Sequence, residues 1–494
     1  MRHLPSSLTP LITLSLIGIF SMCSTGSIAD KGVLQKEKIS ALIEQGEYIA
    51  ATQSMQNLLK QNVLTSTEQD YYAFEIERLD RVSKDFSASK ADVIAYIQKY
   101  YPELSETDLD RWEASKALES RVINGNKRYF ARAARNLFRI DAEMVSIWND
   151  QHPEEEITSG SGARLDLNVH IASIIQSTQE SNKIYAEPQH ISIKQSVVVD
   201  ADAVPSGENL KCWIPYPRAI QNRQEDIRLI ESIPKSHILA PENVLQRTIY
   251  MEKLAVAGEA TLFSVEYQFT SHGIFHDINP DLVTTPDSTA DLEPFLQEEA
   301  PHIVFSPALR ELSERIIGNE TNPYRKAQLL FQWIDEHTPW ASAREYSTIR
   351  CIPQYAYENG HGDCGIQTLF FITLCRMNGI PARWQSGWEL QPPDNSMHDW
   401  GMIYFEPYGW VPMDVTYGLR NNMDQQIKWF YLGGMDSYRI IFNDGISQRF
   451  IPEKTHFRSE TIDSQRGEVE WSGGNLYFDK WDWKFEWKLL EKVK

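Results

Sequence analysis

The spacing of apolar residues changes along the chain and predicts three structured regions. Residues 30–160 carry helical apolar spacing, and Ser89 and Ser105 are each followed three residues later by an acid, a combination typical of a helix start. Residues 188–275 instead contain short runs rich in Val, Ile, Tyr and Phe between polar turns, which predict a β-sandwich. Residues 300–494 alternate between helical and strand-like segments. We therefore expect a multidomain protein.

Polar segments and one aromatic run mark the limits of these regions. Residues 152–163 (HPEEEITSGSGA) are rich in Pro, Glu, Ser and Gly and predict a linker, and the acidic residues 280–301 lead into the last region. Residues 481–488 alternate aromatic with charged side chains, which predicts a strand with one apolar face. We interpret this face as packed in a core, and the alternative is an aromatic platform for a sugar or peptide ligand.

The first 29 residues have the pattern of a secretory signal peptide. Residues 11–20 (LITLSLIGIF) form an apolar run too short to span a bilayer, and Ser27 and Ala29 are small residues at the positions that a signal peptidase reads. We expect an exported protein, in the periplasm, at the cell surface or outside the cell, with no transmembrane segment beyond the signal. The alternative is a lipoprotein acylated at Cys23.

The charge of the chain bears on its partners. A formal net charge of −20 argues against nucleic acid as a partner, because phosphate binding requires clustered Lys and Arg. One basic stretch, residues 121–139, is interpreted as a solvated helix face, with an acidic-ligand site as the alternative. The sequence leaves the oligomeric state open.

Few cysteines follow the signal: Cys212, Cys351, Cys364 and Cys375. This number is too small for a disulfide framework in so long a chain, and the pairing of these cysteines stays open. At least one of them is expected to be a free thiol, which in an oxidising compartment requires a reason. Cys375 lies in the middle of an apolar helical run and is interpreted as a core residue.

Cys364 stands where a Gly-rich turn meets a predicted helix. Residues 359–365 (NGHGDCG) indicate a turn, residues 366–377 have helical apolar spacing, and Gly379 and Pro381 end the helix. Unpaired N–H groups and the helix dipole at an N-terminus stabilise an anion. We therefore expect a lowered pKa and more thiolate at Cys364.

A histidine and an aspartate are predicted to meet on one hairpin. His398 opens a strand-like run, residues 399–405, which turns at residues 407–409 and returns as a second strand that ends at Asp414. A carboxylate at Asp414 would accept the second imidazole N–H and fix the tautomer of the base. The nearest alternative for this orienting role is Asp399.

These features occur in a fixed order between residues 305 and 420: Gly-Asp-Cys at 362–364, Gly-Ile-Pro-Ala-Arg at 379–383, His-Asp-Trp at 398–400, and Asp414. The combination resembles the transglutaminase-like superfamily over less than a third of the chain. The resemblance implies a papain-like α+β fold, in which the nucleophile helix packs on an antiparallel sheet. It also implies the catalytic triad Cys364, His398 and Asp414.

The predicted fold is thus an N-terminal α-helical region, a central β-sandwich and a C-terminal α+β transglutaminase-like (papain-like) domain. That last domain covers residues 300–494 and includes the aromatic-rich C-terminal extension. Of the possible oxyanion donors, the backbone N–H of Cys364 is one. The second is left open among four upstream residues: Trp340, Gln354, Tyr355 and Tyr357.

The expected chemistry follows from the nucleophile. Cys364 attacks an amide carbonyl of a peptide or protein, His398 protonates the leaving amine, and an acyl-thioester forms. Hydrolysis is favoured because water is abundant at an exported site. The alternatives are protein-glutamine amine transfer, which cross-links proteins, and a non-catalytic binding module or cell-surface scaffold that retains the fold.

No cofactor or metal is expected. His361 and Asp363 lie close to Cys364, but their spacing with His398 matches no familiar zinc signature. The sequence also contains no run of closely spaced acids ending in a bidentate Glu of the kind that binds calcium.

Overall fold

The computed structural model describes residues 28–61, 63–152, 165–286 and 290–491. The predicted signal peptide lies almost wholly outside these ranges, as does most of the predicted linker at 152–163. The chain divides into two compact units, Met1–Ala73 and Phe74–Lys494. Among the helices that are described, none combines the length and the apolar character needed to cross a bilayer.

The first unit is helical where it is described. It contains α1 (Ile28–Glu44), α2 (Tyr48–Leu59) and the beginning of α3 (Ser66–Asp85). Helices α1 and α2 contact each other across a turn at Gly46, whose φ of 79° is a conformation that glycine adopts readily. Ala51, Met55 and Leu58 follow one face of α2 and are fully buried, as the helical spacing of apolar residues predicts.

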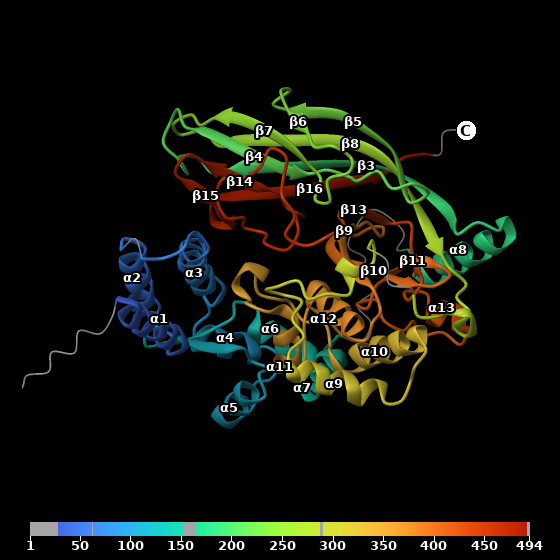
Figure 1. Ribbon diagram of the computed structural model, residues 1–494, viewed down its shortest axis with the longest axis horizontal. Coiled ribbons are helices and arrows are strands. Elements are labelled where there is room, and N and C mark those ends of the chain that lie inside the picture. Colours follow the sequence, from blue (N-terminus) through green and yellow to red (C-terminus); the bar gives the residue numbers. More distant parts are fainter. Residues whose placement is uncertain (1–27, 62, 153–164, 287–289, 492–494) are drawn as a thin grey trace, which may run out of the picture. The chain divides into compact units, whose positions relative to one another are not determined.

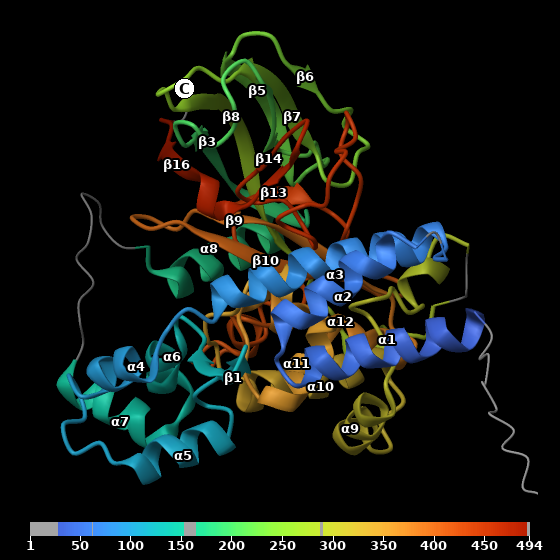
Figure 2. The same ribbon diagram turned by 90° about the vertical axis from the view of Figure 1, so that its left-hand side faces the viewer.

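In the second unit, a group of short helices precedes the sheets: α4 (Lys90–Ile97), α5 (Glu106–Ala114), α6 (Ala133–Ile140), α7 (Ala142–Gln151) and α8 (Leu167–Ser181). Figure 2 shows α4 to α7 gathered together. The predicted helix starts at Ser89 and Ser105 are confirmed, because each serine forms a capping box with the acid three residues on.

Two strands interrupt the helices where continuous helix is predicted. β1 (Ser120–Ile123) and β2 (Asn126–Tyr129) form an antiparallel hairpin inside the basic stretch. Asn124 and Gly125 join them with φ values of 47° and 76°. An Asn-Gly pair favours this left-handed turn, so the local turn preference overrides the helical interpretation here.

Two five-stranded antiparallel sheets follow. The first has the order β12-β8-β3-β16, with β5 also paired to β8, and the second has the order β15-β14-β4-β7-β6 (Figure 1). The strands of the first are β3 (Tyr185–Val199), β5 (Gln224–Ile233), β8 (Thr261–Phe275), β12 (Gly434–Met435) and β16 (Trp481–Leu489). Those of the second are β4 (Asn209–Pro215), β6 (Ile238–Leu239), β7 (Thr248–Leu254), β14 (Glu468–Trp471) and β15 (Gly474–Leu476).

Both sheets contribute to one apolar core. Ile193 of β3 and Ile249 of β7 are fully buried members of the same cluster, which also contains Val469 of β14. The predicted C-terminal strand is confirmed as β16, which pairs with β3 along its whole length. Trp481 and Phe485 of β16 are buried in that core, as expected, whereas Trp483 of the same predicted face is 40% exposed.

A four-stranded antiparallel sheet carries the predicted hairpin. Its order is β11-β10-β9-β13, with β9 (Ala382–Glu389), β10 (Ser396–Phe405), β11 (Gly409–Met413) and β13 (Arg439–Asn443). The accompanying helices are α9 (Pro307–Ile317), α10 (Pro323–His337), α11 (Ile352–Asn359), α12 (Cys364–Met377) and α13 (Gln425–Lys428). Short 3-10 helices lie at Pro280–Leu282, Glu293–Phe295, Tyr346–Thr348 and Phe478–Lys480.

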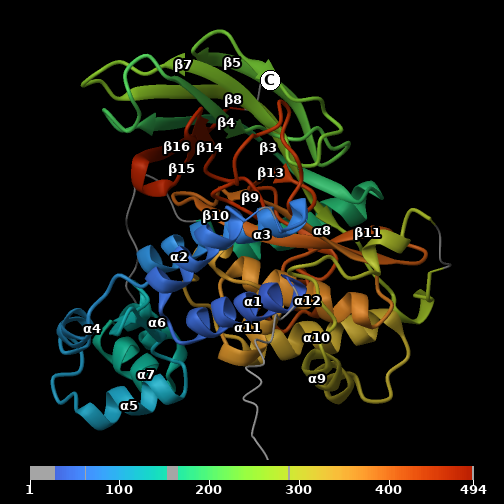
Figure 3. The same ribbon diagram turned by 60° about the vertical axis from the view of Figure 1, so that its left-hand side comes forward.

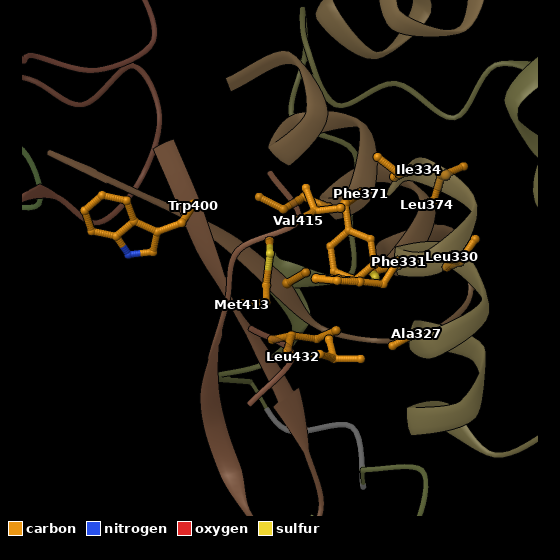
Figure 4. Packing of buried hydrophobic residues seen from close by; sticks show 14 of the residues in the cluster. Ala327, Leu330, Phe331, Ile334, Phe371, Leu374, Trp400, Met413, Val415 and Leu432 are labelled. Atoms are coloured by element: carbon orange, nitrogen blue, oxygen red, sulfur yellow. The ribbon is translucent and has the colours of Figure 1, made fainter. Parts of the chain in front are cut away.

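Helix α12 packs between this sheet and α10. It contacts β9 and β10 on one side and α10 on the other (Figure 3). Figure 4 shows Phe371 of α12 close to Phe331 of α10, with Met413 on the sheet side. All three side chains are fully buried, so the start of α12 is held rigidly relative to the sheet.

Candidate active site

Cys364 is the first residue of α12, close to the predicted helix start. Asp363 caps the helix, because its carboxyl accepts a hydrogen bond from the backbone N–H of Ile366 at 3.1 Å. The turn before it is fixed by a β-bridge between Trp340 and Gly362. Cys375 of the same helix is buried in the core, as expected.

His398 and Asp414 come together across the hairpin of β10 and β11. The register pairs Gly401 with Met413, which places Asp414 just beyond β11 and opposite the beginning of β10. Nε2 of His398 lies 2.7 Å from Oδ2 of Asp414, and the two residues are 4% and 0% exposed. Because an ionised carboxylate only accepts hydrogen bonds, Nε2 carries the proton and Nδ1 is the basic nitrogen.

Asp414 is held as a carboxylate by several donors. Burial alone would raise its pKa, but the charges of His398 and Arg439 outweigh burial and lower the pKa to about 2. Nη1 of Arg439 lies 2.5 Å from Oδ2, and the backbone N–H groups of Thr416 and Tyr417 donate to Oδ1 at 3.1 and 3.3 Å. Hydrogen bonds to both of its oxygens therefore fix the orientation of the Asp414 carboxylate.

Arg439 is a residue that the sequence reasoning missed. It lies on β13, is 0% exposed, and joins Asp414 to Asp436, whose Oδ2 accepts from Nε at 2.9 Å. A guanidinium group in a fully buried strand needs such partners. The sequence feature that could have indicated this buried arginine is its position directly before the apolar run Ile-Ile-Phe at 440–442.

The sulfur of Cys364 lies beside another carboxyl group, that of Asp399. Sγ is 3.4 Å from Oδ2 of Asp399. Burial raises the pKa of the Cys364 thiol well above its ordinary value, and the nearby Asp399 and Asp363 raise it further. The expected lowering of the pKa by the helix N-terminus is therefore wrong for the resting site, where burial of the sulfur disfavours the thiolate. The resting nucleophile is a thiol.

Cys364 opens into two cavities of about 510 and 290 Å³, which share Trp340, Cys364, Ser396 and Met397 in their lining. The larger one continues past Asp399 toward Trp483, and the smaller one contains His398. A third cavity of about 460 Å³ shares Glu389, Tyr417 and Arg420 with the smaller one. The three cavities are thus neighbours in a row, and Cys364 lines two of them.

The four candidates for the second oxyanion donor separate in the structure. Trp340 lines both cavities that meet at Cys364 and is 42% exposed. Gln354 instead bonds to Ser306 and Glu358, and the Tyr355 hydroxyl donates to Glu119. Tyr357 lines neither of these two cavities. The position of Trp340 therefore fits a contact with substrate better than the other three.

The remaining cysteines are unpaired. Cys212, Cys351, Cys364 and Cys375 are all free thiols, and Cys23 lies outside the described ranges. Within the described part of the chain, His, Cys, Asp and Glu side chains form no group of three or more that could hold a metal ion.

Comparisons with known proteins find a family match in the same part of the chain. The model of the transglutaminase-like superfamily matches residues 310–415. An uncharacterized protein of Haemophilus influenzae is 26% identical over 153 residues, which is 26% of this chain and 40% of that relative. The uncharacterized protein YebA of Bacillus subtilis is 29% identical over 84 residues, 14% of this chain and 11% of YebA. The chain thus spans less than half the length of either relative.

A solved structure described as "a Putative Cysteine Protease from Cytophaga hutchinsonii" has a TM-score of 0.43 and 18% identity, and the match covers 63% of this chain and 93% of that one. The segment that matches the superfamily model contains the helix start at Cys364 and the hairpin of His398 and Asp414. Residues 310–415 of this chain form a transglutaminase-like domain.

Proposed function

We propose that this protein is a cysteine enzyme that cleaves amide bonds of peptides or proteins through an acyl-thioester, with water as the acceptor. The observation that carries the proposal is the buried contact of 2.7 Å between His398 and Asp414, together with the cavity that both His398 and Cys364 line. A base oriented in this way beside a thiol is the arrangement that nucleophilic catalysis requires.

In the proposed reaction, Sγ of Cys364 attacks the carbonyl carbon while its proton passes to Nδ1 of His398. The raised pKa of the thiol means that proton transfer accompanies the attack instead of preceding it. The imidazolium is stabilised by Asp414, and it then protonates the leaving amine as the tetrahedral intermediate collapses. Water repeats the sequence on the thioester, and its proton returns through His398 to the sulfur.

The row of cavities supports an extended substrate. Together the three cavities run from Trp483, past Cys364 and His398, to Asn168 and Asp394. Such a row accommodates a polypeptide on both sides of the scissile bond, whereas a small amide would occupy only its centre. We therefore propose a peptide or protein as the substrate.

Amine transfer remains the alternative within the same chemistry, because either acceptor resolves the same thioester. A non-catalytic module or a cell-surface scaffold is the alternative from another class. A labelled primary amine and a mixture of peptides and proteins, incubated with the full chain and analysed by mass spectrometry, separate the three. Hydrolysed products support the proposal, incorporated amine indicates transfer, and unchanged substrates contradict both.

Two matched variants make this test specific for the thiol. Cys364→Ala should abolish turnover while circular dichroism shows an intact fold. Cys351→Ser removes another free thiol, one that lies in neither cavity beside Cys364, and should leave turnover unchanged. Turnover that persists in Cys364→Ala would exclude this residue as the nucleophile.

We also propose export, on the basis of the N-terminal sequence pattern, and a three-part organisation. The helices before residue 160 would form one region, and the two five-stranded sheets with their common core would form the β-sandwich. N-terminal sequencing of secreted protein should begin near Asp30. A lipid-modified Cys23 would show the anchored form instead.

A further inference from the structure

The carboxyl group of Asp399 is in direct contact with the nucleophile and has no part in the proposed triad. Its Oδ2 lies 3.4 Å from Sγ of Cys364 and 3.0 Å from the hydroxyl of Tyr346, and its Oδ1 accepts from Nε2 of Gln465 at 2.7 Å. Asp399 is 2% exposed. A carboxyl group this deeply buried, next to a reacting atom, determines the local charge.

Counting the protons around Tyr346 gives the first indication of that charge. Its hydroxyl contacts Oδ1 of Asp363 at 2.9 Å and Oδ2 of Asp399 at 3.0 Å. A hydroxyl has a single proton, so both contacts are hydrogen bonds only if one carboxyl group supplies a proton of its own. This count requires a proton on either Asp363 or Asp399 and does not by itself choose between them.

The carboxyl group of Asp463 favours Asp399 as the protonated group. The side chain of Asp399 is hydrogen-bonded to that of Asp463, and two carboxyl groups form such a bond only when they share a proton. Asp463 also accepts from Ser386 at 2.7 Å and faces the positive charges of Arg458 and Arg466. The negative charge of the pair therefore resides on Asp463 and the proton on Asp399.

The electrostatic surroundings favour the same state. Burial raises the pKa of Asp399 well above its ordinary value, and Asp463 and Asp363 raise it further. The other titratable groups that face Asp399 are Tyr346 and Cys364, and burial raises the pKa of both. Each of them is neutral near pH 7, so Asp399 has no cation in direct contact that would favour its ionisation.

We propose that Asp399 is a further catalytic residue, a neutral carboxylic acid in contact with the sulfur of Cys364, whose ionisation switches the nucleophile off. While neutral, Asp399 places no charge beside the sulfur as the thiol loses its proton. Once ionised, it places a negative charge beside the sulfur and opposes loss of the thiol proton.

The attack of the Cys364 thiol on the carbonyl balances in protons and electrons. The S–H bond breaks and its proton goes to Nδ1 of His398, the sulfur–carbon bond forms, and the π electrons of the carbonyl move to its oxygen. Asp399 keeps its own proton throughout. The consequence for turnover rests on the proposed function, whereas the effect on the sulfur is independent of any substrate.

Alkylation of Cys364 by iodoacetamide tests the effect on the sulfur. The rate is measured against pH on the full chain, with the labelled peptide identified by mass spectrometry. Asp399→Asn and the wild type should react alike at acidic pH. As pH rises and Asp399 ionises, the variant should become faster by about tenfold, the equivalent of one pKa unit. If the ratio of the two alkylation rates stays the same at every pH, the proposal is overturned.

A second variant and a matched control guard against effects of folding. Asp463→Asn removes the anion that keeps the proton on Asp399, so its alkylation rate should fall below that of the wild type already at a lower pH. Asp444→Asn removes a buried acid that pairs with Arg383 at 2.6 Å and lines neither cavity beside Cys364. Its profile should match the wild type. An Asp463→Asn profile identical to the wild type would contradict the shared proton.

The outcomes distinguish this inference from the proposed function. Diverging alkylation profiles without any amide product would support the role of Asp399 at the sulfur and overturn the enzyme proposal. If turnover is found, the alkaline limb of kcat/KM should move to higher pH in Asp399→Asn. A limb that does not move would overturn the catalytic role of Asp399 and leave the amide chemistry standing.

Discussion

At the scale of single residues, Asp414 has two hydrogen-bonding neighbours with different tasks. His398 is the proposed base, and Arg439 is a fixed charge that continues to Asp436. Asp414→Asn should lower kcat by about two to four orders of magnitude, because the imidazolium loses its carboxylate. It should also lower the free energy of unfolding by about 3 kcal/mol, because buried Arg439 loses one of two counterions.

Asp436→Asn is the matched control for this prediction. It removes the other counterion of Arg439 and does not touch His398, so a similar loss of stability should accompany a much smaller loss of kcat. The measurements are steady-state kinetics and urea unfolding of the two variants beside the wild type. Equal losses of kcat would mean that Asp414 acts only through Arg439.

The residues near the thiol differ in how far they could be predicted. Cys364, His398 and Asp414 belong to short motifs within 51 positions, and local pattern placed the last two on one hairpin. Arg439 and Asp463 reach the site from later segments that carry no motif. Their contacts depend on long-range pairing, such as that of β13 with β9, which residue spacing does not encode.

At the scale of elements, Gly365 allows the first turn of α12 to approach Tyr346 and Asp399. A methyl group at this position would overlap the Tyr346 hydroxyl and Oδ2 of Asp399. Gly365→Ala should therefore slow the alkylation of Cys364 and reduce turnover by about tenfold or more. Adding Tyr346→Phe removes the hydroxyl and should restore part of the loss. A Gly365→Ala variant with wild-type rates would contradict this packing.

Some helices and strands can be predicted from the local sequence pattern, and others cannot. The start of α12 and the strands β10, β11 and β16 follow from apolar spacing. The hairpin of β1 and β2 does not, because its short strands are mostly polar and only the turn at Asn124 carries a signal. The pairing of strands could not be predicted either, because paired strands such as β3 and β16 are separated by hundreds of residues in the sequence.

At the scale of the whole molecule, buried acids make stability depend on pH in both directions. Burial raises the pKa of Asp363 and Glu460 to about 7, so the stability that they contribute is complete below about pH 4 and is lost as pH rises through 7. Asp414 has the opposite sign. Its pKa near 2 gives stability that is complete above about pH 4 and is lost as pH falls toward 2.

The combined contribution of these carboxyl groups to stability should therefore be largest between about pH 4 and 6. Thermal unfolding should show a Tm lower by roughly 5 °C or more at pH 8 than at pH 5. Glu460→Gln removes one of the titrating groups and should make the alkaline limb less steep. Equal Tm values at the two pH values would show that these carboxyl groups are ionised at no cost in the folded protein.

Strand β16 should be required for folding and not for the chemistry itself. It covers the edge of β3, and Trp481 and Phe485 enter the core shared by the two sheets. Deletion of residues 481–494 should expose that core and give insoluble or strongly destabilised protein. A soluble, active protein without β16 would contradict the importance of this edge.

The return of the C-terminal strands to β3 and β4 has a consequence for synthesis of the protein. Cys364, His398 and Asp414 leave the ribosome well before the strands that complete both sheets. Asp463 and Gln465, which set the state of Asp399, follow Asp414 by about fifty residues along the chain. A nascent chain thus carries its reactive thiol before the surroundings that regulate it exist. Full reactivity should arise only after the last strand has been translated, so an unfinished chain is protected from its own nucleophile.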